Sequence, residues 1–298
     1  MGIRFSRTDE TAHKRLSVLI FGEPKVGKTT LAKTLPLTSD DKLLYVAADP
    51  GQLALRDRKF VVAQPDKDEL TEQFFDDVRD HVRKDGNKYE WIFVDGVDEV
   101  ADAILKSKLR VQRDGRKAYG EMAEYVESWM KAIRDVRGVS VVFVTHIEQR
   151  EAGDGEVENI PMFPGKQIQN HVNEWFDLIG CMRLVRNSDN KLERYIQFRR
   201  EADWRYVVGD RSGVTELYEE PDLGKLFRKI HEAGFQTKGE WRTPTVKLAD
   251  LQELVELGKQ HNKTPQDIKA ILESDFGGKQ GVELTLVELE KLKSLVAS

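Results

Sequence analysis

Residues 22–29 read GEPKVGKT, a complete match to the phosphate-binding loop pattern G-x-x-x-x-G-K-[ST]. The flanks of this motif suit it, because residues 16–21 (LSVLIF) have the length and apolarity of a buried strand and a helical stretch over 29–35 is stopped by Pro36. A strand, a glycine-rich turn and a helix in this order direct backbone N–H groups at a phosphate chain. The sequence therefore predicts a nucleoside triphosphate site. The residues expected to form it are Gly22, Glu23, Pro24, Lys25, Val26, Gly27, Lys28, Thr29 and Thr30.

Apolar runs of strand length alternate with helical periodicities over most of the chain. Further strands are expected at residues 43–48, 60–63, 91–94 and 139–145, and a strand pair at 179–185 and 195–199. Apolar residues at helical spacing predict helices around 70–82 and 122–136. This alternation predicts an α/β fold with a mostly parallel central sheet flanked by helices.

The length of 298 residues suits one large domain with a small appendage. We expect an N-terminal tail at 1–13, an ATPase core at 14–235, a linker at 236–247 and a small helical module at 248–298. Two capping boxes, Thr264 with Asp267 and Thr285 with Glu288, support helices in the last module.

Composition narrows the setting of the protein. No apolar stretch approaches the ~20 residues of a membrane span, and residues 1–13 lack the apolar region of a signal peptide. The single cysteine, Cys181, permits no internal disulfide, which fits a reducing cytosol. We therefore expect a cytoplasmic protein without a membrane partner. The net charge of −5 requires any nucleic-acid contact to come from local basic loops.

The acid expected to support a metal ion is Asp95, which ends the apolar strand WIFVD. Its carboxylate would hold Mg²⁺ through the water shell of the ion, beside the hydroxyl of Thr29, while Lys28 would reach the β- and γ-phosphates. The cofactors expected from these residues are ATP and Mg²⁺.

Hydrolysis also needs a group that orients the attacking water, and three carboxylates are candidates. Asp49 follows the strand at 43–48, where the crevice of a parallel sheet lies, although it also suits a turn in the sequence DPG. Asp98 and Glu99 follow Asp95 closely, and the alternative interpretation of both is a carboxylate at a helix start. His146 ends the strand at 139–145, where it would sense the γ-phosphate or simply be a hydrogen-bonded histidine.

Three stretches resemble the core of the RecA/RadA recombinases, and in particular the phage-encoded, RecA-like single-strand annealing ATPases. They are YVAADPGQLAL (residues 45–55), RDGRKAYG (113–120) and the stretch that starts VTHIEQRE (144–151). The resemblance covers about residues 14–230 and implies a RecA-like P-loop ATPase in which Asp49 stands where the recombinases have their catalytic glutamate. It places Thr145 and His146 at the polar sensor pair. It also implies a homo-oligomer, either a ring or a filament, located in the host cytoplasm if the chain is encoded by a phage.

Single-stranded DNA is the partner implied by the same resemblance, because 113–120 and 148–169 correspond to the two DNA-binding loops. Cations along the DNA backbone and flat side chains under the bases are the chemistry that such binding needs. The residues expected to supply it are Arg113, Arg116, Lys117, Tyr119, Arg150, Phe163 and Lys166. A solvated turn and a flexible surface loop are the alternative interpretations of the two segments.

A late arginine cluster, Arg199, Arg200 and Arg205, is expected to contact the nucleotide of a neighbouring subunit, unless it pairs with Glu201 and Asp203. The function predicted is an ATP-dependent, single-stranded-DNA-binding recombinase or annealing ATPase, with a single-strand-binding protein as a further expected partner. The alternatives are a nucleotide-switched assembly or signalling protein that does not bind DNA and an ATPase like a helicase loader.

Overall fold

The computed structural model describes residues 15–49, 51–66, 69–151, 157–186, 190–200 and 205–236, and parts of 254–296. The chain divides into two compact units, Met1–Gln236 and Thr237–Ser298. In the second unit, α8 (Pro265–Asp275) begins at the predicted capping box, where Thr264 N donates to Asp267 Oδ2 (2.7 Å) and Asp267 N donates to Thr264 Oγ1 (3.3 Å). The box at Thr285 and the segment 236–247, apart from the backbone of residue 236, lie outside the described residues.

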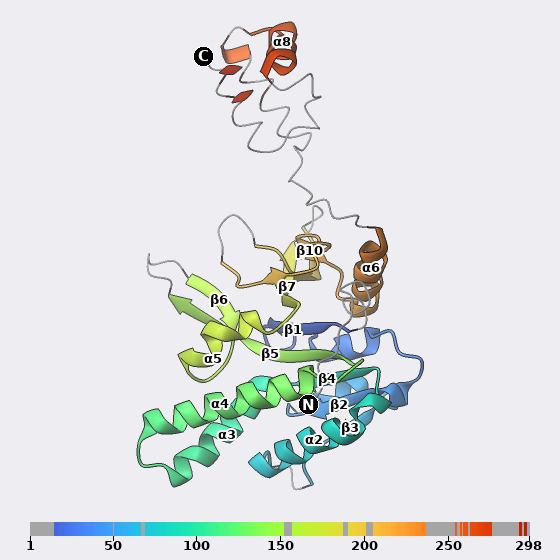
Figure 1. Ribbon diagram of the computed structural model, residues 1–298, viewed down its shortest axis with the longest axis vertical. Coiled ribbons are helices and arrows are strands. Elements are labelled where there is room, and N and C mark those ends of the chain that lie inside the picture. The colour runs from blue at the N-terminus through green and yellow to red at the C-terminus, as the bar shows by residue number, and fades with distance from the viewer. Residues whose placement is uncertain are drawn as a thin grey trace, which may run out of the picture. The chain divides into compact units, whose positions relative to one another are not determined.

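A ten-stranded, mostly parallel sheet forms the centre of the first unit (Figure 1), which confirms the predicted fold class. The order β10-β8-β7-β1-β5-β4-β2-β3 places β5 between β1 and β4, with β6 paired to β5 and β9 paired to β7. The strands β7, β1, β5, β4, β2 and β3 are parallel, whereas at one edge β8 is antiparallel to β7 and β10 is antiparallel to β8. The carboxyl ends of β1, β5, β4 and β2 therefore meet at one edge of the sheet.

The bounds of the strands are β1 (Ser17–Gly22), β2 (Leu43–Ala47), β3 (Val61–Ala63), β4 (Trp91–Asp95), β5 (Ser140–Glu151), β6 (Val157–Pro161), β7 (Leu178–Arg186), β8 (Leu192–Gln197), β9 (Gly209–Asp210) and β10 (Tyr218–Glu219). The helices of the first unit are α2 (Glu72–Asp85), α3 (Val97–Val111), α4 (Gly115–Arg134), α5 (Lys166–His171) and α6 (Leu223–Gln236). Short 3₁₀ helices occur at η1 (Thr29–Thr34), η2 (Asp40–Lys42), η3 (Gln52–Leu55), η4 (Gly86–Lys88) and η5 (Val172–Glu174).

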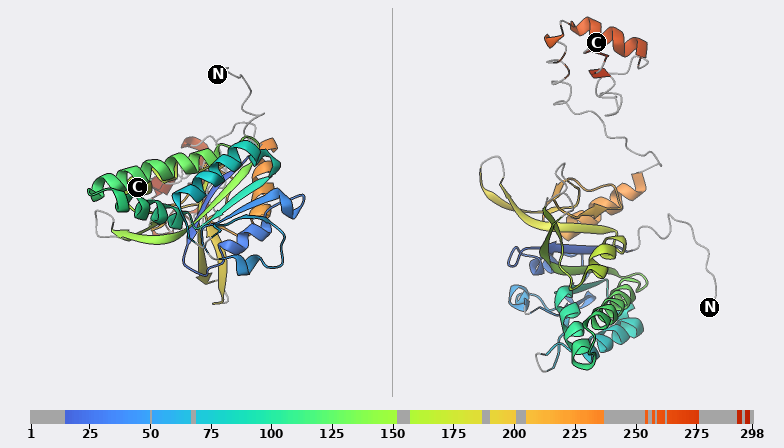
Figure 2. Two further views of the ribbon diagram at one scale, coloured as in Figure 1. Left: turned by 90° about the horizontal axis from the view of Figure 1, so that it is seen from below. Right: turned by 90° about the vertical axis from the view of Figure 1, so that its left-hand side faces the viewer.

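Two hydrophobic layers cover the two faces of the sheet, because successive side chains of a strand point to opposite sides. In β1, Leu19 and Phe21 belong to the layer beneath α2, α3 and α4, whereas Val18 and Ile20 belong to the layer beneath η1 and α6. Trp129 of α4 is fully buried in the first layer, and its Nε1 donates to the carbonyl oxygen of Phe75 (2.8 Å). Figure 2 shows α3 and α4 side by side along one face.

Three segments differ from their predicted form. The helix after the phosphate-binding loop is a 3₁₀ helix rather than an α-helix. Residues 115–120, predicted as part of a loop, form the start of α4, because the side chain of Asp114 caps that helix by accepting from Arg116 N (2.9 Å). Strand β5 continues past His146 to Glu151 and pairs with β6 in a hairpin, so that residues 148–151 and 157–161 of the expected loop are strands.

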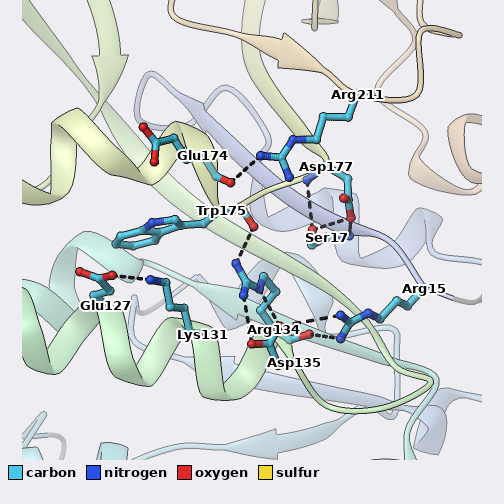
Figure 3. A network of polar contacts seen from close by, with 10 residues as sticks. All are labelled: Arg15, Ser17, Glu127, Lys131, Arg134, Asp135, Glu174, Trp175, Asp177 and Arg211. Carbon is cyan, nitrogen blue, oxygen red and sulfur yellow. Dashed lines mark hydrogen bonds and ion pairs between the residues drawn. The ribbon is translucent and has the colours of Figure 1, made fainter. Parts of the chain in front are cut away.

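A polar network fixes the opposite edge of the sheet, where β1 and β7 begin (Figure 3). Ser17 Oγ donates to Asp177 Oδ2 (2.6 Å), and Arg134 Nη1 donates to the carbonyl oxygen of Trp175 (2.9 Å). Trp175 is buried within the hydrophobic core. The network therefore fixes the amino-terminal ends of β1 and β7. The nucleotide site is expected at the opposite edge, where the strands end. No helix within the described residues is both apolar enough and long enough to cross a bilayer.

Candidate functional site

The phosphate-binding loop has the backbone shape of an anion cradle. Lys25 and Gly27 have positive φ angles, 64° and 110°, and they flank Val26. Alternation between right- and left-handed conformations turns successive N–H groups toward one point, where an anion can bind. Gly22 is also required sterically, since a β-carbon there would lie 2.4 Å from the carbonyl oxygen of Met182 on β7.

Lys28 is buried inside this loop. Its Nζ donates to the carbonyl oxygens of Gly22 and Glu23, both at 2.8 Å. Burial lowers the pKa of Lys28, and the nearby charges of Asp95 and Asp98 oppose that shift. A desolvated ammonium group held only by neutral oxygens gains strongly from an anionic partner, so the position suits a phosphate ligand.

Asp95 receives two hydroxyl hydrogen bonds on one oxygen. Thr29 Oγ1 and Tyr45 OH both donate to Oδ2 of Asp95, each at 2.6 Å. Burial raises the pKa of Asp95, whereas these hydroxyls and the charge of Lys28 lower it. Thr29 and Asp95, separated in sequence, are thus brought together as predicted for a pair that supports a metal ion.

Tyr45 is a site residue that the sequence motifs do not indicate. The tyrosine stands in the otherwise aliphatic strand β2, its side chain is fully buried, and its ring stacks on Phe93 with a centroid distance of 5.8 Å. A polar aromatic residue in a buried parallel strand is the signal that marks it, because a buried hydroxyl needs a partner.

Asp49 lies beside Asp95 through its backbone. Its N–H donates to the carbonyl oxygen of Asp95 (3.0 Å), and its own carbonyl accepts from Gly51 N (2.8 Å). A β-carbon on Gly51 would lie 2.9 Å from Thr29 Oγ1 and 3.2 Å from Asp95 Oδ2. The turn that follows β2 therefore packs directly on the Thr29–Asp95 pair.

His146 forms a close pair with Asp98. Its Nδ1 lies 2.6 Å from Oδ2 of Asp98, whose side chain is 5% exposed and whose Oδ1 has no partner among the described residues. The bond to Asp98 raises the pKa of His146, and partial burial opposes the shift. Asp98 is thus engaged with the histidine, whereas Glu99 of the same helix turn is exposed.

Thr145 takes a different role from the one implied by the resemblance. Its side chain is fully buried, and its Oγ1 donates to the carbonyl oxygen of Met162 (2.8 Å) after β6. The hydroxyl is occupied by the return of the hairpin, so Thr145 does not form an exposed sensor pair with His146. The placement of Thr145 at the sensor is therefore wrong for this conformation.

These residues fit a nucleotide with Mg²⁺. Within the described ranges, no group of three or more His, Cys, Asp or Glu side chains could hold a metal ion by itself. Mg²⁺ is commonly bound through one or two carboxylates together with substrate phosphates and water. Asp95 and Thr29 provide such a partial set beside Lys28 and the loop, so the donor set suits an ion that arrives with the phosphates.

The expected DNA-contacting residues differ in how accessible the structure leaves them. Arg113, Arg116, Lys117 and Tyr119 are exposed around the α3–α4 turn, and Tyr119 has 44% of its surface exposed. On the second segment, Lys166 is exposed, and Arg150 donates to Glu158 Oε2 (2.9 Å).

The structure contradicts the expected role of Phe163 in DNA binding. Its side chain is only 1% exposed and belongs to the core beneath α4, so its ring cannot stack on a base. The neighbouring Met162 is the exposed apolar residue of that turn, at 42%.

The arginines expected to act on a neighbour lie away from the phosphate-binding loop. Arg199 and Arg200 follow β8, and this strand runs antiparallel to β7, toward the edge where β1 begins. Arg199 Nη2 donates to the carbonyl oxygen of Gly213 (3.0 Å), and the carbonyl of Arg205 accepts from Asn159 N (2.6 Å). Glu201 and Asp203 lie outside the described residues. The role of the three arginines stays a prediction that requires a second subunit.

The sheet, the loop after its first strand, and a buried aspartate at the end of β4 together define a P-loop nucleoside triphosphatase. The AAA domain family matches residues 14–212, and the chain belongs to that family. It therefore contains an AAA-type ATPase domain. A comparison with curated proteins finds no match.

Proposed function

We propose that the chain is an ATP-dependent, single-stranded-DNA-binding ATPase of RecA-like type, which assembles on itself and acts in phage recombination or strand annealing. One observation carries the proposal. Strand β5 passes the nucleotide site at His146 and continues without a break into its hairpin with β6, which is the segment that resembles a DNA-binding loop. A change at the nucleotide would thereby reach this hairpin through one continuous strand.

The roles of the site residues follow from their positions. ATP with Mg²⁺ supplies an electrophilic phosphoryl group and a divalent charge. Lys28 exchanges its two carbonyl partners for phosphate oxygens, and Thr29 and Asp95 hold the ion. Tyr45 keeps the Asp95 carboxylate in place, and Asp49, held beside the same pair, positions the attacking water.

His146 links the phosphate to the hairpin. Asp98 fixes the ring through Nδ1 and favours its protonated form, which leaves Nε2–H to donate toward a phosphate. The preceding residue, Thr145, donates a hydrogen bond to the carbonyl oxygen of Met162, which follows β6 at the end of the hairpin. A movement of His146 with the γ-phosphate therefore acts on both ends of the β5–β6 hairpin.

The basic α3–α4 turn supplies the expected contact to the DNA backbone. Arg113, Arg116 and Lys117 are exposed there beside the exposed ring of Tyr119. Cations next to an aromatic ring suit a single strand, since phosphates and base faces are both available to them.

The proposal is tested by the fluorescence anisotropy of a labelled oligo-dT. We expect a complex with a non-hydrolysable ATP analogue that weakens as salt rises, and a weaker complex with ADP. Reversal of Arg113, Arg116 and Lys117 to Glu should abolish this complex and preserve ATP binding. A matched control reverses Arg83 and Lys84 at the end of α2 and Lys88 in η4, which are also exposed. If both triple variants bind oligo-dT as well as the unchanged protein does, the α3–α4 turn is not the DNA face.

The acidic surroundings of the hairpin favour a second candidate, a nucleotide-switched assembly protein that does not bind DNA. A cavity of about 400 Å³ between α3 and the hairpin has an acidic excess in its lining, because four acids (Asp98, Glu99, Asp102 and Glu148) outnumber two cations (Arg150 and Lys166). Such a lining repels DNA phosphates and suits a basic partner. Nucleotide-dependent self-association in light scattering, without any oligo-dT complex, is the result expected of this candidate.

A further inference from the structure

Arg194 of β8 lies directly beside the phosphate-binding loop. A β-carbon on Gly27 would be 3.7 Å from Nε and 3.8 Å from Cδ of Arg194, with Met182 Cε at 3.3 Å. Gly27 immediately precedes Lys28, in the part of the loop whose N–H groups cradle the α- and β-phosphates. The Arg194 side chain therefore lies close to the cradle, within van der Waals range of a β-carbon at Gly27, although it is far from the loop in sequence.

The register of three strands explains this position. Gly22 at the end of β1 is opposite Met182 of β7, and Met182 is opposite Ile196 of β8. Because β8 is antiparallel, Arg194 lies two residues beyond that level, where the loop begins, opposite Leu184. Side chains at alternate positions share a face, so Arg194 is on the side of Ile196 and Met182, which pack in the same layer as Val26 and Leu31 of the loop and η1.

The guanidinium group forms no ion pair with an acid of the described residues. Arg194 is exposed, and none of the hydrogen bonds or ion pairs among the described residues engages it. Arg183 and Arg186 of the same hairpin differ, since Arg183 donates to Gln197 Oε1 (2.7 Å) and Arg186 donates to the carbonyl of Asn190 (3.0 Å). A planar, always charged donor held by a paired strand beside an anion cradle is suited to phosphate oxygens.

We propose that Arg194 binds the α- and β-phosphates of the nucleotide held by its own subunit. This inference rests on the nucleotide site and does not depend on DNA binding. It assigns to Arg194 a role distinct from that of Arg199 and Arg200, because β8 leads those two away from the loop of their own subunit. It also separates Arg194 from a γ-phosphate contact, because both ATP and ADP carry the phosphates at Gly27.

The test is calorimetric binding of a non-hydrolysable ATP analogue and of ADP to the full chain. Loss of a charge-assisted contact is expected to weaken both nucleotides roughly tenfold in Arg194→Ala. Arg194→Lys should recover part of the loss, since lysine keeps the charge without the planar fork. The matched control is Arg186→Ala, which removes the same charge from the same hairpin and should stay within about twofold of the unchanged protein.

Each outcome is decisive for the proposal. Equal affinities in Arg194→Ala and the unchanged protein would overturn it, as would a loss for the ATP analogue with ADP unaffected. Failure of the unchanged protein to bind either nucleotide would instead refute the nucleotide site itself. Arg194→Ala should have the melting temperature of the unchanged protein without nucleotide, and a smaller increase with ADP.

Mixing of variants tests whether the contact is made within one subunit. The Lys28→Ala protein should bind no nucleotide but retains Arg194. Adding it in excess to Arg194→Ala should leave the weakened affinity as it is. Recovery of affinity in the mixture would show that Arg194 serves a neighbouring subunit, and would contradict the assignment.

Discussion

Oδ2 of Asp98, in the first turn of α3, lies 2.6 Å from Nδ1 of His146, at the point where β5 leaves the sheet for its hairpin. The pair places an acid and a base from different elements at the carboxyl edge, next to the charges of Lys28 and Asp49. It fixes the imidazole ring in one orientation. The same contact gives the site a dependence on pH that can be measured.

The His146–Asp98 pair should stabilise the fold at low pH. Since the bond to Asp98 raises the folded-state pKa of His146 above its ordinary 6.5, its contribution is fully present below about pH 6.5. That contribution disappears as the pH rises through the raised pKa. Urea unfolding of the unchanged protein and of His146→Gln at a series of pH values should show a difference that shrinks with rising pH. A difference that grows with pH would contradict the pairing, and Asp98→Asn should resemble His146→Gln.

Removal of the Lys28 charge should greatly weaken ATP binding and change the free energy of unfolding only slightly. The ammonium group is buried and its pKa is lowered, so Lys28→Met is expected to change the free energy of unfolding by no more than about 1 kcal/mol without nucleotide. Its affinity for ATP should fall by about 100-fold or more, because two charge-assisted phosphate contacts are lost. Urea unfolding and calorimetry measure the two effects. Unchanged ATP affinity would remove Lys28 from the site.

Tyr45→Phe should weaken Mg²⁺ binding indirectly, through Asp95. The mutation removes one of the two hydroxyl donors of Asp95, so the pKa of that buried carboxylate should rise further and Mg²⁺ should bind more weakly. We expect a loss of about 1–2 kcal/mol in the free energy of unfolding and a higher Mg²⁺ requirement for turnover. Tyr89→Phe is the control, since that hydroxyl bonds the exposed His81. An identical Mg²⁺ requirement in both variants would contradict the role of Tyr45.

Gly51→Ala should disturb the Thr29–Asp95 pair by crowding alone. The φ and ψ angles of Gly51, −85° and −1°, are accessible to alanine, but the new methyl would lie 2.9 Å from Thr29 Oγ1. ATP turnover should fall at least about tenfold, with a change in melting temperature of only a few degrees. Gly209→Ala, where an added β-carbon meets no atom within 4 Å, should behave like the unchanged protein. Normal turnover in Gly51→Ala would show that this turn moves off the site.

The local motifs were predictable because they depend on short stretches of sequence. Apolar runs, and the glycine, proline and polar residues that bound them, predict three features: the phosphate-binding loop, the strand ending at Asp95 and the parallel sheet. The pairing of Asp98 with His146 and of Tyr45 with Asp95 could not be predicted, because each joins residues far apart in sequence through strand order and register. The burial of Phe163 depends in the same way on where α4 packs.

The direction of β8 determines which of its arginines lies beside the phosphate-binding loop. The sequence indicates a strand pair over 179–199 and draws attention to the basic end of the second strand. Since β8 is antiparallel to β7, its beginning rather than its end lies beside the phosphate-binding loop, and Arg194 is the arginine that reaches Gly27. A one-residue shift in this register would place the side chain on the other face.

ATP turnover with and without oligo-dT tests the central claim, that a P-loop site is coupled to single-stranded DNA. The account predicts faster turnover with oligo-dT in the unchanged protein, none in Lys28→Ala, and basal turnover without stimulation when Arg113, Arg116 and Lys117 are reversed. The stimulation should decline as salt weakens the DNA complex. Turnover that is identical with and without oligo-dT, in a protein that forms no salt-sensitive complex with it, would contradict the account.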